Sequence, residues 1–352
     1  MDLNVLRTFD CDQKQEWLQR WKDWPKREIW AHPDYVQLFV RSGEEALCLA
    51  MGNSEKGALM PLISRPLELE VWGKDFCGCI DLVSPYGYGG VFSWGGLTAK
   101  EFWTAADQWA LANGAVILFL RLSLFPEQLL PITGQLETKS CNVVRNLEPS
   151  EESIWMDYEH KVRKNVKRAR ESGLVVRIDD SGEGLDQFLG VYEETMKRRN
   201  ANAWYFFSKE FFDNLVLKLH GQFVFFYIMN QSQVISCELV LLSQDHAYSY
   251  LGGTIESAFH LRPNDLLKHE VILWAKRNGK RTFVLGGGYA NMDGIYNYKL
   301  SFSPTGNVPF QVLKKIYDET RYFELILARQ KWEARNGNNW KPREEYFPSY
   351  RS

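Results

Sequence analysis

The sequence predicts an α/β fold of two successive domains, each a mixed, largely antiparallel twisted sheet flanked by helices. Three observations lead to this prediction. The length of 352 residues exceeds that of a typical single domain and suits two. Apolar residues make up 45% of the chain and charged residues 24%, which is ordinary for a globular protein with a sizeable core. The order of elements predicted for the first half also returns in the second half.

The first half is expected to begin with two helices and a meander of strands. It then continues with a capped helix and a strongly apolar strand. Thr98 and Glu101 have the spacing of a capping box, and Asn113-Gly114 ends the helix that they open. The last meander strand runs into a glycine-rich and aromatic loop, Ser84–Gly90. The predicted elements lie at residues 13–21, 34–41, 45–51, 58–64, 76–83, 98–112 and 115–120.

The second half repeats this plan with a helix, a strand, two helices, three strands, a helix and a strand. The last of these helices is expected to begin at Asn264 or Asp265, either of which could cap it, and to end before Gly279. The predicted elements lie at residues 153–171, 174–178, 183–199, 209–220, 222–229, 234–243, 246–253, 265–278 and 281–285. Residues 308–335 are predicted helical. The expected domains are 1–149, completed by 308–352 packing back, and 150–307.

Charge and residue usage exclude several classes of function. The formal net charge of −2 gives no global attraction to nucleic acid, so an anionic partner must meet a local basic patch. The six cysteines form no Cys-x-x-Cys pair and the six histidines show no metal-ligand spacing, so no metal site is predicted. The N-terminal stretch lacks the features of a signal peptide, and no apolar run approaches the ~18 residues of a membrane span. We therefore expect a cytoplasmic protein.

The stretch from Leu285 to Pro304 carries the main candidate site. A predicted strand ends in Gly286-Gly287-Gly288, which lets the backbone turn and approach a ligand closely. An aromatic segment follows, and it contains one isolated cation, Lys299. Tyr289, Tyr296 and Tyr298 surround that lysine in the sequence. The alternative is a glycine turn that leads into an ordinary surface helix.

A second candidate is the basic helix. Six cations fall within the ten residues Lys161–Arg170, and Arg163, Lys167 and Arg170 share one face at helical spacing. Such a concentration suits phosphates, either of a nucleotide diphosphate or of a tRNA backbone. A solvated helix face is the alternative.

The element order is that of the Gcn5-related N-acetyltransferase (GNAT) fold, and several motifs resemble the Fem family within it. That family consists of aminoacyltransferases that build peptidoglycan cross-bridges. Arg163-Lys-Asn-Val-Lys-Arg-Ala169 resembles its basic helix, and Leu261-Arg-Pro-Asn-Asp-Leu-Leu267 resembles a helix start. Leu285-Gly-Gly-Gly, Asp293-Gly294 and Tyr298-Lys299-x-x-Phe302 are similar to its glycine and "F-K-x-x-F" signature. The loop Ser84–Gly90 matches a common feature of its first domain.

The resemblance implies roles for individual residues. Lys299 would stabilise the tetrahedral oxyanion of acyl transfer, because a cation at the reacting carbonyl lowers the barrier. Arg163 would contact the diphosphate of the acceptor, with Lys167 one turn further along. The remaining implied substrate-binding residues are the tyrosines of the acceptor path and one helix-start residue: Tyr86, Tyr88, Tyr289, Tyr296, Tyr298 and Asn264. Transfer is expected in a direct ternary complex, without a tightly bound cofactor.

The expected function is transfer of an acyl or aminoacyl group to an amine of a cell-envelope precursor, either peptidoglycan or glycan. The donor would be aminoacyl-tRNA or acyl-CoA, and the acceptor a nucleotide-linked, amino-sugar or peptide compound. One alternative is acyl-CoA-dependent N-acetylation of an amino sugar in polysaccharide biosynthesis. The segment from Gly252 to Pro263 lacks the glycine loop of acetyl-CoA enzymes, which argues against it. Arg121, where tRNA-using Fem proteins often carry an acid, argues for it. A non-catalytic binding module of the same fold is the third possibility.

Overall fold

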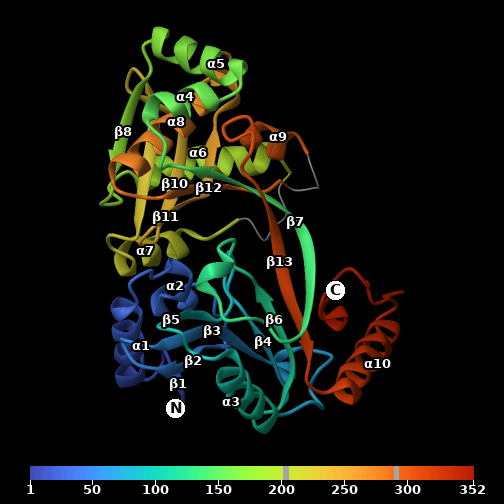
Figure 1. The fold of residues 1–352 in the computed structure, drawn as a ribbon. Helices are drawn as coiled ribbons and strands as arrows, with labels where there is room; N and C mark the ends of the chain where they lie inside the picture. Colours follow the sequence, from blue (N-terminus) through green and yellow to red (C-terminus); the bar gives the residue numbers. More distant parts are fainter. Residues whose placement is uncertain (201–205, 289–292) are drawn as a thin grey trace. The chain divides into compact units, whose positions relative to one another are not determined.

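The structure is a computed structural model that describes residues 1–200, 206–288 and 293–352 (Figure 1). The chain divides into two compact units. Unit 1 comprises Met1–Lys139 and Phe310–Ser352, and unit 2 comprises Ser140–Pro309. The second unit begins ten residues before the predicted boundary because the end of strand β7 (Gln135–Asn146) pairs with strand β12 (Thr282–Gly286). The described strands belong to one mixed sheet with flanking helices, so the predicted α/β class is confirmed.

In unit 1 the strands run in the order β1-β2-β3-β4-β6-β13, and β5 pairs with β3. All of these pairs are antiparallel except β4 with β6. The strands are β1 (Leu3–Arg7), β2 (Glu45–Gly52), β3 (Gly57–Pro66), β4 (Ile80–Val83), β5 (Phe92–Trp94), β6 (Ala115–Arg121) and β13 (Asn307–Ile316). The helices are α1 (Cys11–Asp23), α2 (Pro33–Gln37), α3 (Ala99–Ala112) and α10 (Glu319–Arg335).

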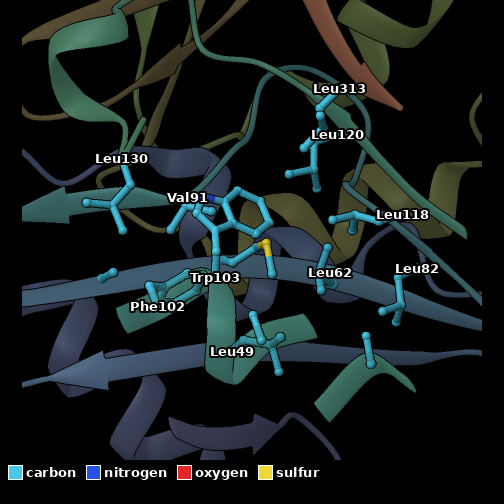
Figure 2. Packing of buried hydrophobic residues seen from close by; sticks show 14 of the residues in the cluster. Leu49, Leu62, Leu82, Val91, Phe102, Trp103, Leu118, Leu120, Leu130 and Leu313 are labelled. Carbon is cyan, nitrogen blue, oxygen red and sulfur yellow. The ribbon is translucent and has the colours of Figure 1, made fainter. Parts of the chain in front are cut away.

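Strand β6 is buried by two hydrophobic clusters in unit 1. Leu118 and Leu120 pack with Phe102 and Trp103 of α3 and with the leucines of β2 and β3 (Figure 2). Val116 and Ile117 belong to a second cluster, which contains Tyr322 and Leu325 of α10. Burial on both sides explains why β6 reads as a continuous apolar run rather than an alternating one.

The end of the chain is part of unit 1. Asp81 of β4 is fully buried, and it accepts a hydrogen bond of 2.5 Å from the hydroxyl of Tyr350. Arg351 forms an ion pair with the same carboxylate and a second one with Glu70. The C-terminal residues are therefore anchored by a buried charge pair.

In unit 2 the strands run in the order β7-β12-β11-β10-β9-β8. Only β11 and β12 pair in parallel. Besides β7 and β12, the strands are β8 (Val175–Asp179), β9 (Phe223–Asn230), β10 (Gln233–Leu242) and β11 (His246–Thr254). The helices are α4 (Glu151–Asp157), α5 (His160–Glu171), α6 (Leu185–Arg198), α7 (Lys209–Lys218), α8 (Pro263–Arg277) and α9 (Gly294–Leu300).

Three predicted elements are wrong in type or extent. The helix expected over 153–171 is two helices, since Tyr158 and Glu159 have extended backbone angles between α4 and α5. Helix α8 begins at Pro263 after Arg262, whose left-handed φ of 62° ends the preceding turn, so neither Asn264 nor Asp265 is the cap. Residues 308–335 are not one helix: 307–316 form β13, in which the apolar residues Val308, Phe310 and Val312 recur at every second position as in a strand.

Strands β1, β5 and β7 had no predicted counterpart, because their short or polar sequences lack a clear alternation of apolar residues. Among the described residues, no helix is long and apolar enough to cross a membrane. The same residues contain no group of three or more His, Cys, Asp or Glu side chains placed to hold a metal ion.

Candidate functional site

The central strands of unit 2 separate at the site. The parallel pairing of β11 with β12 covers only His246–Tyr248 and Thr282–Val284. Beyond this point β11 continues to Thr254 alongside β10, with a register shift between Leu239 and Val240. Strand β12 instead turns away at Gly286, whose φ is +83°. Beyond the point of separation, the described backbone groups of these two strands do not hydrogen-bond to each other.

Lys299 lies at the glycine triplet that follows β12. Helix α9 places it there, and the carboxylate of Asp293 caps that helix by accepting from the Tyr296 N–H at 2.8 Å. The Lys299 Nζ donates a 2.7 Å hydrogen bond to the carbonyl of Gly287. A Cβ at Gly286 would lie 3.2 Å from that Nζ, and a Cβ at Gly287 would lie 3.0 Å from the side chain of Asn142. The glycines therefore allow the amine to approach the backbone closely.

The surroundings of Lys299 weaken its proton affinity. Burial is the main cause, and it lowers the pKa of this lysine from 10.5 to about 7. Lys268 and Arg199 lower the pKa further, whereas Glu238 and Asp293 oppose the change. Near neutral pH the side chain therefore exchanges between ammonium and amine. Its ammonium form is a short-range hydrogen-bond donor of the kind that stabilises an oxyanion.

A buried ion pair lies beside Lys299. Lys268 of α8 contacts the carboxylate of Glu238 on β10, and its Nζ also donates to the Ser249 Oγ at 2.7 Å. Lys268 is 7% exposed and Glu238 2%, and the second carboxylate oxygen of Glu238 has no hydrogen-bond partner among the described residues. Sequence reasoning missed this pair. A charged residue within the apolar strand β10 (Gln233–Leu242) was the signal that could have found it.

Tyr298 and the start of α8 form the next part of the cluster. Burial raises the pKa of Tyr298 well above its ordinary value, and the carboxylates of Asp265 and Glu238 act in the same direction. The side chain of Asn264 acts in the opposite direction on this pKa, and the Tyr298 hydroxyl is buried without a hydrogen-bond partner among the described residues. Asn165 of α5 donates to the buried Asp265 carboxylate at 3.1 Å. The structure thus brings Lys299, Tyr298 and Asn264 together with residues that the sequence did not single out.

The two predicted phosphate contacts lie on α5 and differ in their surroundings. Arg163 is half-buried, and its Nη1 donates to the carbonyls of Met156 and Tyr158 at the end of α4, the former at 2.8 Å. Lys167 is exposed. Arg163 therefore has a structural contact in addition to any ligand, and its predicted role remains a prediction.

The remaining tyrosines are distributed over both units. The buried Tyr296 donates its hydroxyl to the side chain of Asn307 at 2.7 Å, a contact internal to unit 2. Tyr86 and Tyr88 belong to unit 1, where the ring of Tyr88 packs edge-on against Trp30 at 5.2 Å. Tyr289 lies outside the described residues. The expectation that these side chains line one acceptor path remains a prediction.

Comparison with known proteins identifies a domain family within this chain. Residues 157–300 match the family described as "Acetyltransferase (GNAT) domain", a segment that contains Glu238, Lys268 and Lys299. The chain carries a GNAT acyltransferase domain. No curated protein matches the chain significantly.

Solved structures with a similar fold cover most of this chain. FemX matches with a TM-score of 0.67 at 13% identity, over 89% of this chain and 98% of its own. The C-terminal domain of a putative lysylphosphatidylglycerol synthetase from Agrobacterium fabrum matches with a TM-score of 0.56 at 12% identity, over 92% and 96%. L-PGS from Bacillus licheniformis matches with a TM-score of 0.52 at 13% identity, over 91% and 96%. At these identities the likeness establishes the fold.

Proposed function

We propose that this protein is a Fem-type N-acyltransferase that transfers an aminoacyl or acyl group to an amine of a cell-envelope precursor. The observation that carries the proposal is the position of Lys299. Its amine is held at the glycine triplet where β11 and β12 separate, inside the segment that matches the GNAT domain. No covalent intermediate is needed, because the amine of the acceptor can attack the donor carbonyl directly.

In this mechanism the acceptor amine forms the new C–N bond, and negative charge develops on the carbonyl oxygen. The Lys299 ammonium donates to that oxyanion, in exchange for its contact with the Gly287 carbonyl. When the intermediate collapses, the bond to the donor's leaving group breaks, and the leaving oxygen or sulfur takes up the proton that the acceptor nitrogen loses. The Glu238–Lys268 pair holds one carboxylate and one ammonium near Lys299 and so keeps the local charge balanced.

The start of α8 favours an aminoacyl ester donor over acyl-CoA. A CoA pyrophosphate binds to free amides at a helix N-terminus. Here Pro263 removes one of those amides, and the first turn carries the buried acid Asp265. A 3-10 helix, Glu256–Leu261, occupies the preceding loop. Each feature disfavours an anion at this position.

The likeness in fold supports the same donor class. FemX and the lysylphosphatidylglycerol synthetase share this fold, and the name of the latter describes the joining of a lysyl group to a lipid. The acceptor that we propose is a nucleotide-linked amino sugar or peptide, with its diphosphate at Arg163 and Lys167. The basic face of α5 supports this assignment, since Lys167 is exposed and faces away from the apolar contacts of that helix.

The test is a transfer assay with separate donors. The protein is incubated with aminoacyl-tRNAs or with acyl-CoAs and a nucleotide-linked amino-sugar peptide, and radiolabel in the acceptor is measured. We expect transfer from aminoacyl-tRNA, with a loss of roughly 10²–10³-fold in Lys299→Met and little loss in the matched control Lys167→Met at saturating acceptor. Transfer from acyl-CoA alone to an amino sugar would favour the alternative enzyme. Saturable binding without turnover would favour a binding module.

A further inference from the structure

Arg121 occupies a position in unit 1 where ligands commonly bind. It is the last residue of β6, next to the parallel strand β4, and the loop Ser84–Gly90 follows β4 at the same edge. Ligands bind preferentially at the carboxyl ends of neighbouring parallel strands. The Arg121 N–H donates to the Ser84 Oγ at 2.9 Å, and the Ser84 N–H donates to the Phe119 carbonyl at 2.9 Å. The loop is thereby fixed to the end of β6.

The guanidinium of Arg121 has no acidic partner among the described residues. Its one hydrogen bond is a long contact of 3.3 Å from Nη1 to the Ser84 carbonyl, and it lies 5.2 Å from the ring centre of Phe119. Arg65, a cation that acts on Arg121, is paired with Glu44 at 3.0 Å. An arginine offers five donors, so most of the hydrogen-bonding capacity of Arg121 is unused in this structure.

Aromatic side chains lie near this guanidinium, which is half-buried. Burial lowers the pKa of Arg121, and Arg65 acts in the same direction. The side chains of Tyr86, Tyr346 and Tyr35 lie near the guanidinium. A half-buried cation without an acidic partner interacts more strongly with an anion than a fully solvated one does, because less water screens the pair.

The loop around Arg121 is built to hold a fixed shape. Gly87 has a φ of +98°, and a Cβ there would lie 2.4 Å from the ring of Trp30. The Tyr35 hydroxyl donates to the Tyr86 carbonyl at 2.7 Å. Tight packing and a left-handed backbone at Gly87 make the wall of the site rigid, so little ordering is needed when a ligand binds.

We propose that Arg121, together with the Ser84–Gly90 loop, forms a binding site for an oxyanion, the carboxylate or phosphate of a small molecule. The planar guanidinium would form two parallel hydrogen bonds to such a group. The side chains of Tyr86 and Tyr35 lie near the guanidinium and suit the remainder of a polar ligand. The site is in unit 1, outside the matched GNAT segment, and its test measures anion binding rather than acyl transfer.

The experiment titrates the intact protein with sodium phosphate, with sodium acetate, and with sodium chloride at matched ionic strength. The ¹H–¹⁵N signal of the Arg121 Nε–H, assigned by its loss in Arg121→Lys, reports contact with the anion. Thermal unfolding reports the stabilisation that binding produces. Arg121→Met keeps the length of the side chain and removes the charge. Arg7→Met is the matched control, since Arg7 is an ion-paired arginine of the same unit.

We expect saturable movement of the Arg121 signal with phosphate or acetate and not with chloride. Loss of a charge-assisted pair should weaken the affinity by roughly tenfold or more in Arg121→Met, whereas Arg7→Met should bind as the wild type does. Response to phosphate alone or to acetate alone identifies the anion. If neither anion moves the signal beyond the effect of chloride, or if Arg121→Met retains the full thermal response, the site does not exist. Should Arg121→Met fail to fold, the wild-type signal alone decides between these results.

Discussion

Replacement of Lys299 by Met should make the protein more stable at neutral pH while it removes activity. The lysine is held where burial lowers its pKa from 10.5 to about 7. Such a change corresponds to about 5 kcal/mol against the charged form in the folded state. Methionine has a similar length and no charge, so it avoids this cost. The lost hydrogen bond to Gly287 and local repacking offset part of the gain, and we expect a net stabilisation of about 1–3 kcal/mol at pH 7.

The pH dependence distinguishes this explanation from better packing. Below about pH 7 both the folded and the unfolded wild-type protein carry the proton, so the full cost of the charge is present. Between pH 7 and the unfolded pKa the unfolded state binds more protons, and wild-type stability therefore rises with pH. The advantage of Lys299→Met should shrink by up to about 1.4 kcal/mol per pH unit in this range.

The assay is urea unfolding of both proteins at several pH values, with the exposed Lys167→Met as control. That control should differ from the wild type by no more than roughly 0.5 kcal/mol at every pH. A Lys299→Met protein less stable than the wild type at pH 7, or an advantage that stays constant up to pH 10, would refute the reasoning. Stabilisation combined with lost transfer would mark Lys299 as a residue kept for function.

Three further predictions concern other parts of the chain. Glu238→Gln leaves the Lys268 ammonium buried without its counter-ion and should lower the free energy of unfolding by about 3–5 kcal/mol. The double variant with Lys268→Met should recover most of this loss in urea unfolding, and additive losses would contradict the pairing. Arg163→Ala should raise the KM for a diphosphate acceptor, and it should reduce stability by roughly 1–2 kcal/mol because Arg163 also donates to two carbonyls at the end of α4. If neither the KM nor the stability changes, Arg163 is part of a solvated helix face only. Gly87→Ala combines a left-handed φ with an overlap on the Trp30 ring and should destabilise by about 1–3 kcal/mol in calorimetry, whereas an unchanged melting temperature would show that the loop adapts.

The sequence by itself determined the fold class and the elements that have a strong period. Helix α3 and strand β6 are clear in the printed chain, because a capped amphipathic helix and a continuous apolar strand leave a local pattern. The glycine triplet and the isolated Lys299 were also visible locally. Their neighbourhood in the chain was enough to predict a site, because α9 follows the triplet within a few residues.

Only the tertiary structure decided which residues meet at that site. Glu238 and Lys268 are separated by 30 residues and lie on a strand and a helix, so no spacing rule relates them. Strand β13 was mistaken for a helix because its place in the sheet comes from pairing with β6, about 200 residues earlier in the chain. Arg163 and Arg121 show the same limit, since the sequence does not tell whether carbonyls, carboxylates or solvent surround a charged side chain. Contacts between distant segments set burial and charge balance, and these determine what each residue can do.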